Sequence, residues 1–228
     1  MIDNPPLLTI RRGHRRPDPA LLAAFRGAQT SHLCDAMDGR GALDWRIKPL
    51  DPATAVFAGP ALTCQAYPAD IVAMFGALAE AEPGDVVVCA TDAFTATAAF
   101  GDLAAGMMRN KGIAAFVTDG LARDKAGILA TGLPTFCQGI SPNSPARNGP
   151  GTVGFPVTLA GVHVRPGDIV VGDADGVVIV PQERAQEVLA RLAEIRAAEA
   201  ETEAKVRAGL TNPGFMADIL AHARIEQG

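Results

Sequence analysis

Aromatic residues, basic charge and long apolar runs are all scarce in this sequence. Phe, Trp and Tyr make up only 5% of its 228 residues, although 48% of the residues are hydrophobic. Alanine and valine dominate instead, which suits close packing of helices on a sheet. The chain has 20 Lys and Arg residues and 25 Asp and Glu residues, so its net charge is -5. This charge argues against nucleic acid as the main partner.

No stretch has the length and apolarity of a membrane span, and the N-terminus lacks the apolar core of a secretory signal. The four cysteines, Cys34, Cys64, Cys89 and Cys137, lie far apart in the chain and form no C-x-x-C motif. We therefore expect a cytoplasmic protein with free, buried thiols and no membrane partner.

Several common catalytic motifs are also missing. The sequence has no G-x-S-x-G, no Walker loop, no H-E-x-x-H and no G-x-G-x-x-G. Its four histidines form no pair at helical spacing, and none of its four lysines lies in the middle of an apolar strand. A Schiff-base mechanism thus lacks an obvious nucleophile, which favours metal-assisted chemistry.

The hydrophobic pattern predicts an α/β fold with one compact catalytic domain, residues 1–180, and a C-terminal helical extension, residues 181–228. Helices are expected over 18–29, 30–37, 70–81, 94–111, 124–131, 181–209 and 213–225. Strands are expected over 47–50, 59–66, 86–90, 113–118, 134–138, 157–159, 162–164, 166–171 and 176–180. Since Gly101 can break a helix, a new helix starting at Asp102 is the alternative within 94–111. The Pro- and Gly-rich residues 141–152 are expected to form a functional or intersubunit loop.

Residues 11–16, with the sequence RRGHRR, are the one basic cluster. We interpret them as a solvated N-terminal segment. The alternative is an arm that docks on a neighbouring subunit or on a polyanion.

The adjacent pair Arg123-Asp124 is the most informative feature, because it follows the apolar run 112–116 and the turn residues Asp119-Gly120. Open α/β sheets bind ligands at the carboxyl edge of their strands. There Arg123 can bind a carboxylate through two parallel hydrogen bonds, and Asp124 can hold a hard metal ion. The alternatives are a plain salt bridge for Arg123 and a helix N-cap for Asp124.

A second candidate element is Gly101-Asp102-Leu103-Ala104. If a helix begins here, the free amides of Leu103 and Ala104 can bind a carboxylate with help from the helix dipole. Asp102 can then transfer a proton through a water molecule. The alternative is a glycine kink in a packed helix with Asp102 in solvent.

Together these two elements resemble one protein family. It contains 4-hydroxy-4-methyl-2-oxoglutarate aldolase, 4-carboxy-4-hydroxy-2-oxoadipate aldolase and the regulator of ribonuclease E activity A. The same order and spacing of family landmarks extend over roughly residues 28–190. The further matching segments are 31–37 (SHLCDAM), 59–63 (GPALT), 83–86 (PGDV), 139–142 (GISP) and 172–177 (GDADGV).

The resemblance implies a swivelling β/β/α-type fold, ring trimers that stack into hexamers, and a divalent metal, Mg²⁺ or Mn²⁺, at a subunit interface. It implies that Arg123 binds the pyruvyl part of a 2-oxo acid and that Asp124 anchors the metal through a water-rich shell. Gly101, Leu103 and Ala104 are implied to hold substrate oxygens, with Asp102 orienting a catalytic water.

The resemblance also implies a metal-site glutamate from a neighbour's C-terminal helix. Among Glu199, Glu201 and Glu203 we select Glu199, against the alternative of a solvated helix face. The function implied is a class II pyruvate aldolase, acting on a 4-hydroxy-2-oxo acid, with oxaloacetate decarboxylase side activity.

Two other functions stay open. One is a non-catalytic protein that inhibits a ribonuclease E-like enzyme, although such regulators tend to lack the aspartate that stands here at Asp124. The other is a relative acting on a different 2-keto or hydroxy acid.

Overall fold

The computed structural model describes residues 5–226 and 228. Its main feature is a mixed sheet of nine strands, with a central path β1-β10-β3-β4-β6-β8-β2 and a branch in which β13 pairs with β3 and β14. These strands are β1 (Thr9–Ile10), β2 (Lys48–Pro49), β3 (Phe57–Ala66), β4 (Val86–Ala90), β6 (Ala115–Thr118), β8 (Thr135–Cys137), β10 (Gly151–Val153), β13 (Ile169–Gly172) and β14 (Val177–Val180).

The central strands of this sheet are parallel and buried on both faces. β3, β4, β6 and β8 pair in parallel. Along β4, Val87 and Cys89 face one hydrophobic core, whereas Val86 and Val88 face another. Burial on both sides explains why such strands are continuous apolar runs in the sequence rather than alternating ones.

A small parallel sheet lies beside the large one and positions the site described below. It contains β5 (Ala98–Phe100), β7 (Leu121–Ala122) and β9 (Gly139–Ile140) in the order β5-β7-β9. Each small strand directly follows a strand of the large sheet, since β4 leads to β5, β6 to β7 and β8 to β9. The first two units end in a helix, α4 (Asp102–Asn110) and α5 (Lys125–Thr131). The result is a repeated β/β/α arrangement.

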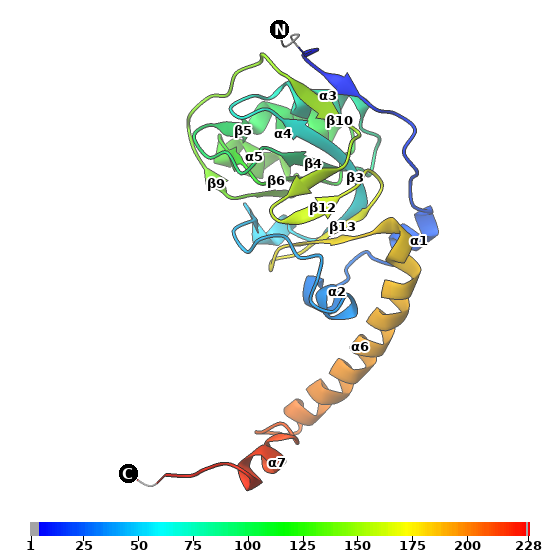
Figure 1. Ribbon diagram of the computed structural model, residues 1–228, viewed down its shortest axis with the longest axis vertical. Coiled ribbons are helices and arrows are strands. Elements are labelled where there is room, and N and C mark those ends of the chain that lie inside the picture. The colour runs from blue at the N-terminus through cyan, green and yellow to red at the C-terminus, as the bar shows by residue number, and fades with distance from the viewer. Residues whose placement is uncertain (1–4, 227) are drawn as a thin grey trace.

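The remaining elements cover this framework. They are α1 (Pro19–Ala23), α2 (Thr30–Ala36), the short turn helix η1 (Pro52–Thr54), α3 (Val72–Glu80), the hairpin β11 (Val157–Leu159) and β12 (Val162–Val164), the turn helix η2 (Gln182–Arg184), α6 (Ala185–Arg207) and α7 (Met216–Ala221). Helices α3, α4 and α5 lie together on one side of the large sheet (Figure 1). The structure therefore confirms an α/β domain with a C-terminal helical extension.

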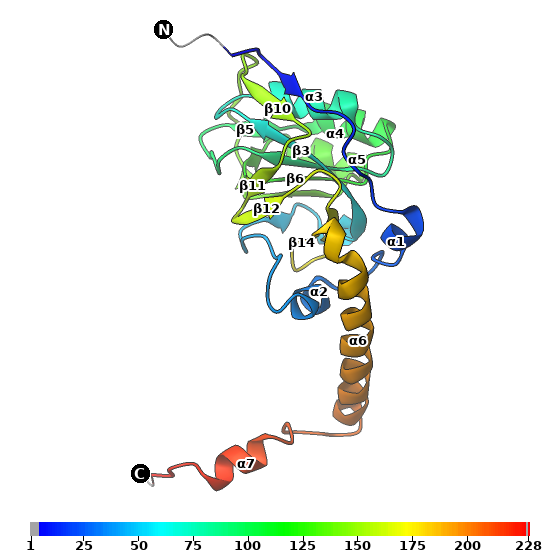
Figure 2. The same cartoon turned by 45° about the vertical axis from the view of Figure 1, so that its right-hand side comes forward.

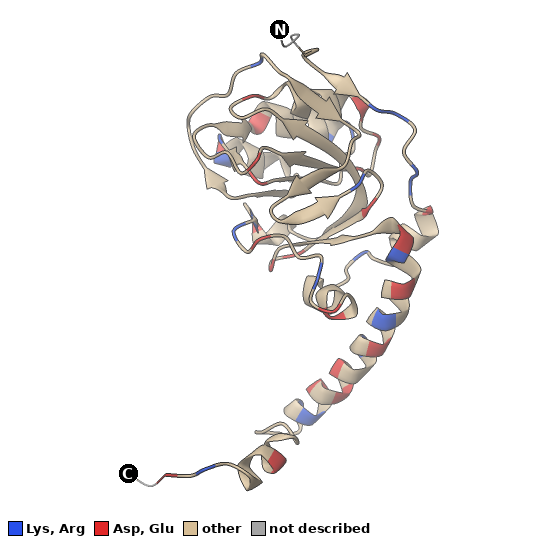
Figure 3. Ribbon diagram, viewed as in Figure 1, with Lys and Arg blue, Asp and Glu red and all other residues tan. Residues whose placement is uncertain are grey.

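The C-terminal helix leaves the body at an angle (Figures 1 and 2). Only the first turns of α6 are buried, through Ala185, Val188 and Leu192, which pack in a core shared with α2, β13 and β14. Further along, the helix carries both acidic and basic residues (Figure 3). Among the described residues no helix is both long and apolar enough to cross a membrane.

The basic cluster at 11–16 is largely exposed to solvent, but two of its arginines are paired with carboxylates of the same chain. Arg12 makes a double hydrogen bond to Glu80 at 2.6 and 2.8 Å, and Arg16 pairs with the buried Asp85. Arg11 lies over the ring of Phe155, 4.0 Å from its centroid. The segment is thus exposed along most of its length, as expected, but it is tied to its own chain through Arg12 and Arg16, whose acidic partners lie on α3 and just before β4.

Other expectations need correction. The segment 94–111 is not one helix, because β5 precedes Gly101 and α4 begins at Asp102, as the alternative predicted. The loop expected over 141–152 ends in β10, which begins at Gly151. The expected helices 18–29 and 213–225 shrink to α1 and α7, each only five or six residues long. The cysteines are free as expected, but Cys34 is only partly buried.

Candidate active site

A small pocket of about 130 Å³ lies where the three parallel strands β5, β7 and β9 end. Gly101 and Asp102 follow β5, Arg123 and Asp124 follow β7, and the loop with Ser144 follows β9. The pair Arg123-Asp124 therefore lies at a carboxyl edge as expected, but at that of β7 rather than of the predicted strand 113–118. Pockets for drug-sized ligands span roughly 300–1,000 Å³, so this one suits a small organic acid.

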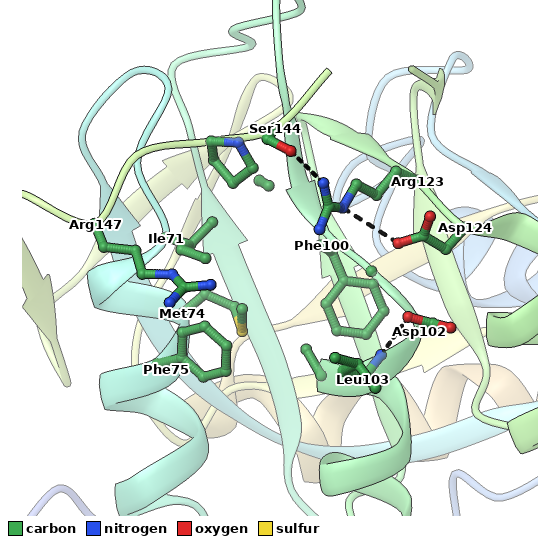
Figure 4. Close-up of a pocket in the computed structure, with 14 residues that line it drawn as sticks. Ile71, Met74, Phe75, Phe100, Asp102, Leu103, Arg123, Asp124, Ser144 and Arg147 are labelled. Atoms are coloured by element: carbon green, nitrogen blue, oxygen red, sulfur yellow. Dashed lines mark hydrogen bonds and ion pairs between the residues drawn. The ribbon is translucent and has the colours of Figure 1, made fainter. Parts of the chain in front are cut away.

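Arg123 reaches into the middle of the pocket, above Phe100 (Figure 4). Its Nε atom lies 3.2 Å from Asp124 Oδ2, and its Nη1 atom donates to the hydroxyl of Ser144. Within the described residues its Nη2 atom makes no hydrogen bond. Part of the guanidinium edge is therefore free to donate to an anionic ligand.

Asp124 does not cap its helix, contrary to the alternative considered above. Although it stands at the N-cap of α5, it has a left-handed φ of 57° and no side-chain capping bond. Its carboxylate instead lies beside Arg123, and 47% of the side chain is exposed. Ion pairs as exposed as this one typically contribute only ~0–1 kcal/mol to stability. Fold stability therefore does not explain the pair.

Asp102 opens helix α4 on the same side of the pocket as Asp124 (Figure 4). Its Oδ1 atom accepts a hydrogen bond of 2.7 Å from the amide of Leu103, so that amide is already engaged. Among the described residues the buried amide of Ala104 has no such partner. Of the two predicted amides, Ala104 thus offers the open donor, at a helix end that favours negative charge.

Two glycines leave the room that these acidic side chains occupy. A Cβ atom at Gly101 would lie 3.0 Å from Asp124 Oδ2 and 3.4 Å from Arg123 Nε. A Cβ atom at Gly127, on α5, would lie 2.5 Å from the Cβ atom of Asp102 and 2.6 Å from its Oδ2. The site therefore requires glycine, which has no Cβ atom, at both positions.

No residue of the opposite wall of the pocket was selected from the sequence, although the loop 141–152, which forms part of it, was expected to be functional or intersubunit. The wall is apolar at α3, where the N-cap residue Ile71 and the helical Met74 and Phe75 line it, and it carries Arg147 from the loop after β9 (Figure 4). Arg147 is exposed, and it has no ion-pair partner within the described residues. The sequence signal was an arginine within a Pro- and Gly-rich loop, because loops on a rigid scaffold often carry binding residues.

Glu199 is not brought to this pocket within one chain. It lies on α6, where its Oε2 atom is 2.5 Å from Nε2 of the buried His32 on α2. The same region forms a separate groove with Asp35 and Glu203. Whether Glu199 serves a neighbouring copy therefore stays a prediction.

Asp119, from the turn before Arg123, also lies outside the pocket and is buried. Its carboxylate accepts hydrogen bonds from Thr91 and from the amide of Ala93, 2.6 to 3.0 Å long. Burial raises the pKa of this carboxyl, and the hydrogen bonds from Thr91 and Ala93 oppose the rise. Asp119 thus joins the end of β6 to the turn after β4.

The described residues contain no cluster of three or more His, Cys, Asp or Glu side chains suited to a metal ion. Asp124 is nevertheless a half-exposed carboxylate beside a pocket, and Asp102 is close by on the same side. Mg²⁺ is commonly bound by one or two carboxylates, with water and substrate oxygens as its other ligands. The donor set fits such an open site and does not fit a closed, all-protein metal site.

Comparison with known proteins gives relatives over most of the chain. A protein from Halalkalibacterium halodurans, named "Putative 4-hydroxy-4-methyl-2-oxoglutarate aldolase", is 38% identical over 187 residues, which cover 82% of this chain and 87% of that protein. Streptomyces coelicolor RraAS2, described as an unusual member of the RNase ES inhibitor RraA protein family, is 30% identical, with a TM-score of 0.73. That match covers 84% of this chain and all of the other.

A third relative is an uncharacterised protein from Pseudomonas syringae pv. tomato, with a TM-score of 0.76 and 26% identity. That match covers 87% of this chain and 97% of the other. The family model described as RraA-like, Aldolase/RraA, matches residues 30–179. These residues include all three small strands and both helices that begin at the pocket. The chain is a member of the RraA-like family of aldolases and RraA proteins.

Proposed function

We propose that this protein is a divalent-metal-dependent carbon–carbon lyase. It cleaves a 4-hydroxy-2-oxo acid into pyruvate and a second keto acid, and it decarboxylates oxaloacetate at the same site. The observation that carries this proposal is the partly free guanidinium edge of Arg123, held beside Asp124 and Asp102 in a pocket the size of a small acid. The aldolase name of the relative from Halalkalibacterium halodurans supports the same reaction class.

The proposed metal, Mg²⁺ or Mn²⁺, would be held by Asp124, whose Oδ1 atom accepts no hydrogen bond from the described residues. A divalent cation there supplies Lewis-acid polarisation of the substrate's 2-oxo group. The remaining chemistry belongs to the chain. Arg123 donates from its free Nη2 to the pyruvyl oxygens, and the amide of Ala104 donates from the start of α4.

The bond cleavage follows from where charge collects. Asp102, through a water molecule, accepts the proton of the 4-hydroxyl group, and the C3–C4 bond then breaks to leave a carbonyl at C4. The electron pair of that bond passes into the enolate of pyruvate, which is afterwards protonated at C3. Arg123 stabilises this enolate more than the neutral ketone, which is the requirement for catalysis. Loss of CO₂ from oxaloacetate leaves the same enolate.

We further propose that the site is completed in a homo-oligomer, a trimer or a hexamer, by Glu199 of a neighbouring copy. The C-terminal half of helix α6 extends away from the body (Figure 2), and its last turns, beyond the contact of Glu199 with His32, carry exposed ion pairs. The following α7 exposes apolar residues, among them Ile219 and Leu220. An extended, partly apolar arm of this kind is suited to pack on another subunit.

The test is a pyruvate-release assay with a panel of 4-hydroxy-2-oxo acids and oxaloacetate, with Mg²⁺, with Mn²⁺ and with a chelator. The proposal expects turnover of at least one diacid that stops with the chelator and returns with metal. The Arg123→Ala variant is expected to lose roughly 10²–10³-fold in kcat, the usual cost of removing a preorganised donor.

A second candidate function is inhibition of a ribonuclease E-like enzyme, favoured by the RNase ES inhibitor family named for the Streptomyces relative. It predicts no turnover with any member of the panel, whatever metal is present. Slowed RNA cleavage by such an enzyme on addition of this protein would then support it.

A further inference from the structure

A single buried carboxylate, Asp70, joins the two segments that form the wall of the pocket opposite Arg123. Only 4% of Asp70 is exposed. Its Oδ1 atom accepts from the amide of Val72 at 2.7 Å, and its Oδ2 atom accepts from the amides of Asn148 and Gly149 at 2.5 and 3.0 Å. No cation pairs with it among the described residues, so three backbone amides offset the cost of burying the charge.

The amide of Val72 belongs to the first turn of α3, whose Met74 and Phe75, together with the N-cap residue Ile71, line the pocket wall. Asn148 and Gly149 belong to the loop that supplies Ser144, Pro145 and Arg147. A helix cap alone would require only the first of these bonds. The other two tie a loop nearly 80 residues further along the chain to the same carboxylate.

The backbone around Arg147 is held on both sides. Ala146 forms a bridge with residues 69–71, through bonds of 2.6 Å to the carbonyl of Ala69 and 3.2 Å from the amide of Ile71. Asn148 is held by Asp70. Ala69 adopts a left-handed φ of 62°, a costly conformation for alanine that persists only where the surroundings enforce it.

The guanidinium of Arg147, by contrast, has no ion-pair partner among the described residues, and it lies across the pocket from Arg123 (Figure 4). The flanking backbone bonds therefore fix the main chain from which this side chain extends, and no salt bridge within the described residues holds its guanidinium. Two guanidinium groups facing each other over a small pocket suit a ligand with a carboxylate at each end.

We infer that Asp70 is a positioning residue that fixes Arg147 opposite Arg123 and so sets the affinity for the second carboxylate of the substrate. This inference rests on the proposed function, since it takes the pyruvyl end to be bound at Arg123. Asp70 itself does not line the pocket and acts only through the loop.

The test is calorimetric titration in Mg²⁺ of two probes, pyruvate, which has one carboxylate, and 2-oxoglutarate, which has two. In the Asp70→Asn variant, the amide group can accept through only one of its two polar atoms. We expect 2-oxoglutarate to bind roughly tenfold more weakly, the scale of one misplaced charge-assisted hydrogen bond, and pyruvate to bind within about twofold of wild type.

Arg147→Ala should produce the same selective loss. If Asp70 acts through Arg147, the double variant Asp70→Asn/Arg147→Ala should bind 2-oxoglutarate no more weakly than Arg147→Ala alone. Additive losses in the double variant, or equal weakening of both probes by Asp70→Asn, would overturn the inference.

Asp168→Asn is the matched control. Asp168 is 3% exposed and likewise accepts backbone amides, from Arg165 at 2.8 Å and Gln182 at 3.0 Å, but it holds a turn outside the pocket. It should lower the melting temperature and leave both affinities unchanged. A selective loss of 2-oxoglutarate binding here as well would count against Asp70.

If Asp70→Asn does not fold, Asn143→Ala tests the same loop from its other end. The exposed Asn143 donates to the carbonyl of Ala96 at 2.9 Å, and its own carbonyl accepts from Ala98 at 3.0 Å. Its truncation should weaken 2-oxoglutarate selectively, by less than Arg147→Ala does, and unchanged binding would contradict the inference. Failure of wild type to bind either probe would instead contradict the proposed function.

Discussion

At Gly101 the candidate site depends on a hydrogen atom in place of a side chain. The backbone there is extended, with φ of -148° and ψ of 179°, so any residue can adopt it. The constraint is space, because Asp124 Oδ2 lies 3.0 Å from where a Cβ would stand. A methyl group would have to push the carboxylate away from its present position beside Arg123.

We therefore predict that Gly101→Ala lowers kcat/KM for the cleaved acid by about tenfold or more, since small misplacements of reacting groups are costly. Gly139→Ala is the control, because its Cβ would meet only Leu121 Cδ2, at an ordinary 3.6 Å. Pyruvate release and the melting temperature should be measured for both. An active Gly101→Ala variant with wild-type kcat/KM would show that the position of Asp124 does not matter.

Some of the other site residues could be identified from the sequence, and others could not. Arg123 and Asp124 were selected from their order after an apolar run, and the structure places both in one pocket. Arg147 and Asp70 were not selected, because their roles arise from contacts between segments that are distant in the sequence. No local pattern around Asp70 distinguishes it from an ordinary helix cap.

At the scale of elements, apolar runs and turn residues identified most strands of the large sheet. The segments Pro83-Gly84-Asp85 and Pro166-Gly167-Asp168 illustrate why. In both, the aspartate accepts a hydrogen bond of 2.8 Å from the amide three residues earlier, so a local sequence fixes a local turn. Each turn leads directly into a buried strand, and the distant partners of the two aspartates, Arg16 and Gln182, add to a turn that the local sequence already specifies.

The small parallel sheet was not predicted, since its strands are only two or three residues long. A strand of two residues is too short to show the alternation of apolar and polar residues by which strands are recognised in a sequence. Phe100, in β5, stacks on Phe116 of β6 with ring centroids 3.9 Å apart, so packing against the large sheet fixes this strand. Local propensity alone predicts a helix over 94–111. In β5 the tertiary contacts override that propensity.

At the scale of the whole molecule, two predictions concern α6: that the helix extends from the domain, and that Glu199 on it serves a neighbouring site. The helix exists and leaves the body, as expected, but Glu199 on it contacts His32 of its own chain. Its proposed role in a neighbouring site therefore requires that α2 and α6 pack together, as one unit, against the partner subunit. The buried packing of α2 on α6 around Leu33 and Leu192 is consistent with such a unit.

If each site takes Arg123 from one copy and Glu199 from the next, two inactive variants should restore each other. Arg123→Ala and Glu199→Gln, co-expressed in equal amounts, are expected to recover about a quarter of wild-type activity in a closed ring, because that share of interfaces receives both intact residues. Each variant alone should be strongly impaired. Co-expressed material no more active than the average of the two separate variants would mean that no site is shared.

The most direct test of the central claim, that this pocket forms the enolate of pyruvate, needs no knowledge of the rest of the substrate. Pyruvate is incubated with the protein and Mg²⁺ in D₂O, and the methyl proton signal is followed by NMR. The account predicts loss of the signal through exchange, dependent on the metal and at least about 10²-fold slower in Arg123→Ala. Exchange no faster than in buffer, or equally fast in Arg123→Ala, would contradict it.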